Sequence, residues 1–208
     1  IVAIISNAVT IADAGAFSVG LGAMKLIKTL TVSTASTATL LHGSSSVVFD
    51  STYPIYVIKY INVFSSSGQN IAMNFTTDGS NYNVNIQSAT FVAEHTEDDS
   101  TQARLTYSSG YHEQLGTNQV VFNINKGGLR DATDSSGSGE IHIFNPSSTT
   151  YVKNFISRAN SMSEYPGSTD NFVAGYVNST NAVTGVRFHA VSSNTISGTF
   201  LLYGLKDS

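Results

Sequence analysis

Acidic side chains form the densest group of residues in this sequence that could do chemistry. They run over Glu94-His-Thr-Glu-Asp-Asp99. Carboxylate oxygens are the ligands that a hard cation such as calcium prefers, and the candidate metal ligands are Glu94, Glu97, Asp98 and Asp99. Asp131, Asp134 and Glu140 flank a Gly/Ser loop and offer a second group of the same kind. Neither group has EF-hand spacing, so we expect solvated loops and no cofactor, with bound calcium as the alternative.

Patterns of catalytic residues point away from an enzyme. The sequence contains no G-x-S-x-G elbow, which many serine hydrolases use to expose their nucleophile. Neighbouring acids of one loop also lie too close together to serve as the two opposed carboxylates of a glycosidase. The five histidines are dispersed, with no H-E-x-x-H pair for zinc, although His142 and His189 both fall on expected strands and could pair across a sheet. We expect no catalytic residues and no enzymatic activity.

Tyrosine is abundant, with ten residues spread over most of the chain. Its ring combines an apolar body with a polar tip, which suits sugar-binding grooves and protein interfaces. The segment Tyr107-Ser-Ser-Gly-Tyr111-His112 is the best candidate for an exposed recognition loop, and its predicted ligand-binding residues are Tyr107, Tyr111 and His112. The alternative is that tyrosine simply favours strands.

Composition and charge exclude several classes of partner. Only 12% of the 208 residues are charged, against roughly 25% in an average protein, and Ser, Thr, Asn and Gly replace the missing charges. The net charge is −4 without a basic block, which argues against binding nucleic acid. No run reaches the roughly 18 apolar residues of a membrane span, so we expect a soluble chain without membrane insertion. Such a polar, uncharged surface is common on secreted and virion proteins.

Hydrophobic residues alternate with polar ones from Lys25 onward, and turn-forming clusters interrupt them every eight to twelve residues. This pattern predicts an all-β sandwich or barrel of about ten antiparallel strands in one domain, residues 25–208. Two runs, Ile55–Val63 and Ile196–Leu205, are apolar on both faces and are expected to be central or covered. The acidic stretch Ala93–Asp99 is expected to form a single helical turn, because its carboxylates disfavour strands.

Residues 1–24 differ from the rest of the chain, because they are apolar without a regular alternation and lack a cation before Lys25. A signal peptide would carry a basic region ahead of its apolar stretch. We therefore interpret this segment as an extended arm that docks on a neighbouring protein. The assembly residues expected in this arm are Ile1, Val2, Ile4, Ile5, Val9, Ile11 and Phe17.

The second half of the chain resembles a group of uncharacterised virion proteins from bacteriophages of marine bacteria. The resemblance is carried by four segments, Phe91-Val-Ala-Glu-His95, Ile141-His-Ile-Phe-Asn-Pro-Ser-Ser-Thr-Thr-Tyr-Val-Lys153, Phe172-Val-Ala-Gly-Tyr176 and Gly198-Thr-Phe-Leu-Leu-Tyr-Gly-Leu205. It implies a jelly-roll-like domain, and a tail-fibre-like or capsid-accessory protein that is made in the host bacterial cytoplasm and displayed on the virion surface.

The resemblance also implies partners. These are other virion proteins, from the major capsid or the tail, together with further copies of the chain, for which a trimer is favoured by analogy. The leading hypothesis is a non-enzymatic structural accessory protein assembled through its N-terminal arm. The alternative is a receptor-binding module that recognises a host glycan or an outer-membrane protein.

Overall fold

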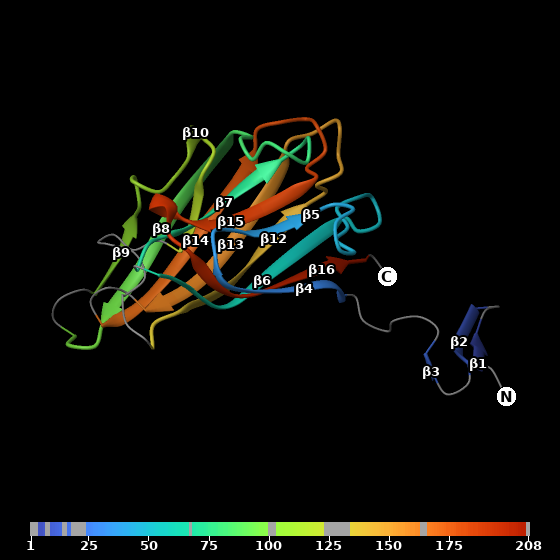
Figure 1. Ribbon diagram of the computed structural model, residues 1–208, viewed down its shortest axis with the longest axis horizontal. Coiled ribbons are helices and arrows are strands. Elements are labelled where there is room, and N and C mark those ends of the chain that lie inside the picture. The colour runs from blue at the N-terminus through green and yellow to red at the C-terminus, as the bar shows by residue number, and fades with distance from the viewer. Residues whose placement is uncertain are drawn as a thin grey trace.

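The computed structural model describes residues 4–6, 9–13, 16–17, 24–66, 68–99, 103–122, 134–162 and 166–206, with the side chains given from residue 24 onward except at 122 and 193. Strands dominate the described residues, and their only helical element is the 3-10 turn Val191–Ser193. The strands form three antiparallel sheets, of which the two larger ones pack face to face (Figure 1). The all-β sandwich expected from the sequence is confirmed.

The larger sheet has nine strands. Eight follow the order β10-β8-β14-β13-β12-β6-β16-β4, and β9 pairs with β8. Their bounds are β4 Met24–Ala35, β6 Ile55–Ser65, β8 Ile86–Thr96, β9 Ala103–Tyr107, β10 Gln114–Gly116, β12 Gly137–Phe144, β13 Lys153–Met162, β14 Gly167–Val177 and β16 Ile196–Leu205. A jelly roll divides eight strands between two sheets, whereas the larger sheet here has nine strands of its own. Jelly-roll connectivity therefore stays a prediction.

The smaller sheet has four strands in the order β11-β7-β15-β5 and lies over the larger one (Figure 1). Their bounds are β5 Ala38–Leu41, β7 Ile71–Thr76, β11 Gln119–Phe122 and β15 Gly185–Ala190. Two residues, Ser36 and Thr37, carry the chain from β4 in the larger sheet to β5 in the smaller one. Because β4 and β5 each end the order of their sheet, this connection closes one side of the sandwich.

The core lies between the two sheets and is built from large aliphatic and aromatic side chains. Phe188 of β15 sits at its centre, with ring centroids 4.9 Å from Phe200 and 5.9 Å from Tyr60. The buried Tyr60 hydroxyl lies 2.7 Å from Ser157 Oγ, which satisfies the polar tip of this ring inside an apolar layer. Burial raises the pKa of Tyr60, so the phenol stays protonated.

A buried lysine holds the loop that leads from the larger sheet to the smaller one. Lys153, at the start of β13, is fully buried, and its ammonium donates to the carbonyl oxygens of Ser179 and Asn181. Both acceptors belong to the loop that leads from β14 in the larger sheet to β15 in the smaller one. Burial lowers the pKa of Lys153, because desolvation disfavours the charged ammonium.

Several expectations from the sequence can be compared with these elements. Alternating runs became β7, β12 and β15, and β12 ends at Phe144 just before Asn145-Pro146. The run Ile196–Leu205, apolar on both faces, became β16, which has a neighbouring strand on each side. The helical turn expected over Ala93–Asp99 is wrong for its first four residues, because β8 continues to Thr96 and only residues 97–99 turn. Pairing with β9 and β14 holds these residues extended, which outweighs their weak strand preference.

The N-terminal segment contains strands of its own. β1 (Ile4–Ser6), β2 (Val9–Asp13) and β3 (Ala16–Phe17) form a small antiparallel sheet, drawn in dark blue in Figure 1. Among the described residues, these strands pair only with one another, and β4 is the first strand of the sandwich after them. The outer edge of β4 carries no neighbouring strand in the described part of the chain.

Candidate interaction surface

An aromatic row crosses the outer face of the larger sheet, the face turned away from the core. Strand register places Phe91 of β8 directly opposite Phe172 of β14 on one side and opposite Tyr107 of β9 on the other. Phe172 in turn lies opposite Arg158 of β13. Residues that face each other across antiparallel strands are close enough for their side chains to interact. The row therefore assembles four side chains from segments up to 81 positions apart.

Two aromatic rings of this row stack on one another. Phe91 and Phe172 have centroids 4.6 Å apart and planes that differ by 8°, which matches the spacing of about 4.8 Å between neighbouring strands. The Arg158 guanidinium covers the other face of Phe172, 4.8 Å from its centroid. Both faces of the Phe172 ring and one face of the Phe91 ring are therefore covered by neighbouring side chains.

Apolar side chains on both sides of the row extend it into a continuous surface. Leu105, opposite Ala93, is 71% exposed, and Ile156, opposite Ala174, is 53% exposed. We call this surface the outer apolar patch and define it by Ala89, Phe91, Ala93, Leu105, Tyr107, Ile156, Phe172 and Ala174. An antiparallel sheet usually presents polar residues on its solvent-facing side, so this face departs from the ordinary pattern.

Charged groups beside the outer apolar patch are paired. Arg158 makes a forked contact with Asp170, with Nη2 2.6 Å from Oδ2 and Nε 3.1 Å from Oδ1, and Asp170 raises the pKa of Arg158. Further along the same row, Glu140 contacts Lys59 at 3.6 Å and His142 at 3.1 Å. These contacts, with that to His142 first, lower the pKa of Glu140. The patch is thus flanked by neutralised charges.

The predicted recognition loop joins this surface at one end. Tyr107 is 58% exposed and its ring lies 5.7 Å from the His112 ring, tilted by 32°. Tyr111 is half-buried, and its backbone carbonyl accepts hydrogen bonds from Thr90 Oγ1 and Gln119 Nε2. The structure therefore brings Tyr107 and His112 together and makes Tyr111 a member of the loop framework. Whether the loop binds a ligand stays a prediction.

Strand geometry directs the carboxylates of the acidic segment to different partners. Glu94 points to the face opposite Ala93 and accepts a 2.7 Å hydrogen bond from Arg104 Nε. In the following turn, His95 Nε2 lies 2.8 Å from Asp99 Oδ1, and Thr96 donates to Asp98 at 2.7 Å. Glu97 is exposed. Within the described ranges, no group of three Asp, Glu or His side chains is arranged to hold a metal ion, and calcium binding by these acids stays a prediction.

The second acidic group is only partly described. Asp131 lies outside the described residues, Asp134 is exposed, and Glu140 is held by Lys59 and His142. The expected pairing of His142 with His189 is wrong, because His142 lies on β12 in the larger sheet and His189 on β15 in the smaller one.

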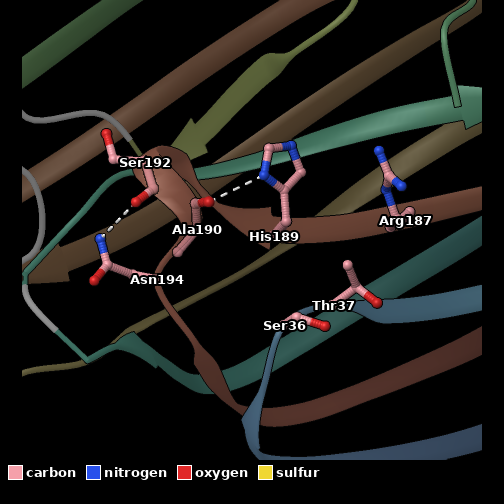
Figure 2. Close-up of a pocket in the computed structure, with 7 residues that line it drawn as sticks. All are labelled: Ser36, Thr37, Arg187, His189, Ala190, Ser192 and Asn194. Atoms are coloured by element: carbon pink, nitrogen blue, oxygen red, sulfur yellow. Dashed lines mark hydrogen bonds between the residues drawn. The ribbon is translucent and has the colours of Figure 1, made fainter.

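A polar hollow of about 390 Å³ lies at one end of the smaller sheet, lined by Ser36, Thr37, Arg187, His189, Ala190, Ser192 and Asn194 (Figure 2). Arg187 and His189 project from the same side of β15. The Arg187 guanidinium donates to Asn74 Oδ1 at 3.2 Å and stacks 4.5 Å above the Tyr82 ring. Among the described residues it has no carboxylate partner, so its remaining donors could bind an anionic group.

His189 contributes a half-buried imidazole beside this hollow. Its Nδ1 lies 3.0 Å from the backbone oxygen of Ala190, and its Nε2 is buried without a hydrogen-bond partner in the described part of the chain. Burial lowers the pKa of His189, and the nearby Arg187 charge acts in the same direction. The ring is therefore held neutral, and it was not among the site residues expected from the sequence.

The assembly residues expected in the arm cannot be placed by side chain. Ile4, Ile5, Val9, Ile11 and Phe17 fall on β1, β2 and β3, for which only the backbone is described, and Ile1 and Val2 lie outside the described residues. Their role in assembly stays a prediction.

Comparison of the chain with protein-family models, with curated proteins and with solved structures finds no match. The resemblance to phage virion proteins therefore also stays a prediction. Within the described ranges, none of the helical structure is long and apolar enough to cross a membrane.

Proposed function

We propose that this chain is a non-enzymatic structural component on the outside of a bacteriophage particle, where it decorates the capsid or forms part of the tail or its fibres. The observation that carries the proposal is the N-terminal segment, whose strands pair with one another and not with the sandwich in the described part of the chain. A segment organised in this way ahead of a complete sandwich is suited to engage a neighbouring protein.

Two further features support an assembly role. The N-terminal strands lead into β4, a strand of 12 residues whose outer edge is free among the described residues. Free edges can accept a strand from another chain. The outer apolar patch adds a second contact surface on the same sheet. An assembled protein can use both, since surfaces that are exposed in the free chain become buried in the particle.

The test is the protein content of purified particles. Quantitative mass spectrometry of gradient-purified virions should find the chain at a fixed ratio to the major capsid or tail protein. Phage encoding Ile4→Asp together with Ile11→Asp should lose the chain from the particle, because charged side chains oppose apolar docking, while Tyr151→Asp, at a position 71% exposed, should retain it. Particles that never contain the wild-type chain would sink the proposal.

A second candidate function is recognition of a host glycan or outer-membrane protein by the Tyr107–His112 loop. It is favoured by the exposed ring of Tyr107 beside His112. In this case the purified protein should bind host cells or their surface polysaccharide, and Tyr107→Ala should weaken binding about tenfold, as loss of an aromatic contact does. Tyr151→Ala is the matched control, and the absence of binding by the wild-type protein would exclude this function.

A further inference from the structure

The outer apolar patch gathers large apolar side chains on one face of the sheet, unlike hydrophobic residues scattered singly over a surface. Its four largest exposed side chains, Phe91, Leu105, Tyr107 and Ile156, are between 42% and 71% exposed. Side chains of this size present on the order of 150–250 Å² when fully exposed, so these four together present roughly 400 Å². The largest apolar patch of a typical monomer covers about 300–600 Å² and is often functional, so this patch is a candidate interaction site.

The orientation of the aromatic rings indicates what kind of partner fits. A sugar ring stacks on the open face of an aromatic side chain, but Phe91 and Phe172 turn their faces toward each other, and Arg158 covers the next face of Phe172. What remains accessible is the rest of the Phe91 and Tyr107 rings with the aliphatic side chains of Leu105 and Ile156. This surface suits the apolar side of another protein sheet.

The charges around the patch favour a second copy of this chain over a charged partner. Arg158 is paired with Asp170, and Lys59 with Glu140, so two such faces can approach each other without repulsion between like charges. A flat surface that meets an identical one does so about a twofold axis. An interface of standard size buries about 800 Å² on each partner around an apolar centre, and the patch can supply that centre.

We propose that the outer apolar patch joins two copies of this chain face to face about a twofold axis. The pair differs from the trimer that the sequence favours by analogy, and the trimer stays a prediction. The proposal goes beyond the proposed function and is independent of it, because association is measured on the purified protein without any particle. If the purified chain does not dimerise, the particle test is unaffected. If the chain is absent from particles, the dimer test is unaffected.

The first experiment is sedimentation equilibrium of the full-length chain over a wide concentration range, with charge placed in the patch. The wild-type chain should follow a monomer–dimer equilibrium. Leu105→Glu and Ile156→Glu should each raise the dissociation constant about 30-fold, the effect of losing a hot-spot side chain. Tyr151→Glu is the matched control, because Tyr151 is as exposed as Leu105 but lies outside the patch, and it should change the constant by less than about threefold.

A second measurement separates loss of association from misfolding of the charged patch variants. The sequence contains no cysteine, so Ala174→Cys, within the patch and opposite Ile156, adds a single thiol. Mild oxidation should convert this variant to a covalent dimer much faster than Tyr151→Cys.

Each alternative result overturns the proposal. These results are a wild-type chain that stays monomeric at several hundred micromolar, a trimeric mass, patch variants that associate like the wild type, and equal cross-linking of the two cysteine variants.

Discussion

Replacing Lys153 by methionine tests how the crossover between the two sheets is held. The ammonium donates to the carbonyl oxygens of Ser179 and Asn181, and a hydrogen bond to a charged group contributes about 1.5–3 kcal/mol. Methionine has a similar length and fills the buried space, but it donates to neither carbonyl. The loop between β14 and β15 then loses its only ammonium contact among the described residues.

Desolvation opposes this loss, because the buried ammonium is less well solvated than in the unfolded chain, as its lowered pKa indicates. Apolar replacement of a buried ionic group can be neutral or even stabilising when this effect dominates. Here the two carbonyls would lose their donor, and leaving such groups unpaired costs about 1–3 kcal/mol each. We therefore expect a net loss of about 2 kcal/mol in the free energy of unfolding for Lys153→Met.

The assay is thermal and urea unfolding followed by circular dichroism. A loss of that size lowers the melting temperature of a chain of this length by about 4–8 °C. Lys59→Met is the control, because Lys59 is 40% exposed and should change stability by no more than about 1 kcal/mol. If Lys153→Met is as stable as the wild type or more so, desolvation outweighs the two hydrogen bonds and the reasoning is refuted.

Three further predictions follow from the described contacts. Gly204→Ala should destabilise the fold by about 1–3 kcal/mol in urea unfolding, because an added Cβ would lie 2.3 Å from the Tyr53 ring; unchanged stability would contradict this close packing. Since burial lowers the pKa of His189 from 6.5, the unfolded chain takes up a proton that the folded chain refuses, so stability should fall as pH drops below 6.5. His189→Gln should flatten that part of the pH profile, and parallel profiles would exclude the effect. Hydrogen bonds from the backbone N–H groups of Asn81 and Ser80, with contacts from the Asn81 amide and the Thr76 hydroxyl, lower the pKa of Asp78. The stabilisation that the Asp78 carboxylate gives the fold is therefore present above the usual Asp pKa and lost as pH falls. Asp78→Asn should lower the melting temperature at pH 7 by an amount that shrinks at acid pH. A difference in melting temperature that does not depend on pH would refute this.

Local patterns predicted the fold class and several strands. The alternation in Ile71–Phe75 and Val186–Ala190 became β7 and β15, because side chains in a strand point alternately to opposite faces. Register between distant strands could not be read in this way. Phe91 and Phe172 stack only because β8 lies beside β14, and nothing near either residue specifies that pairing.

The candidate sites show the same division between local and distant information. Tyr107 and His112 meet because only four residues separate them along the chain, which a local motif can indicate. Glu94 was grouped with Asp98 and Asp99 by sequence distance, but strand geometry directs it to Arg104 on β9. One signal in the sequence could have indicated the outer apolar patch. Phe91-Val-Ala and Phe172-Val-Ala are apolar on both faces of a strand, so one apolar face of each had to lie away from the core.

Cryo-electron microscopy of the intact phage particle tests the central claim most directly. If the proposed virion role is right, repeated density on the outside of the particle should fit the sandwich of β4–β16, with the segment before β4 extending into a neighbouring capsid or tail protein. Particles whose complete outer density leaves no place for this sandwich would exclude that role.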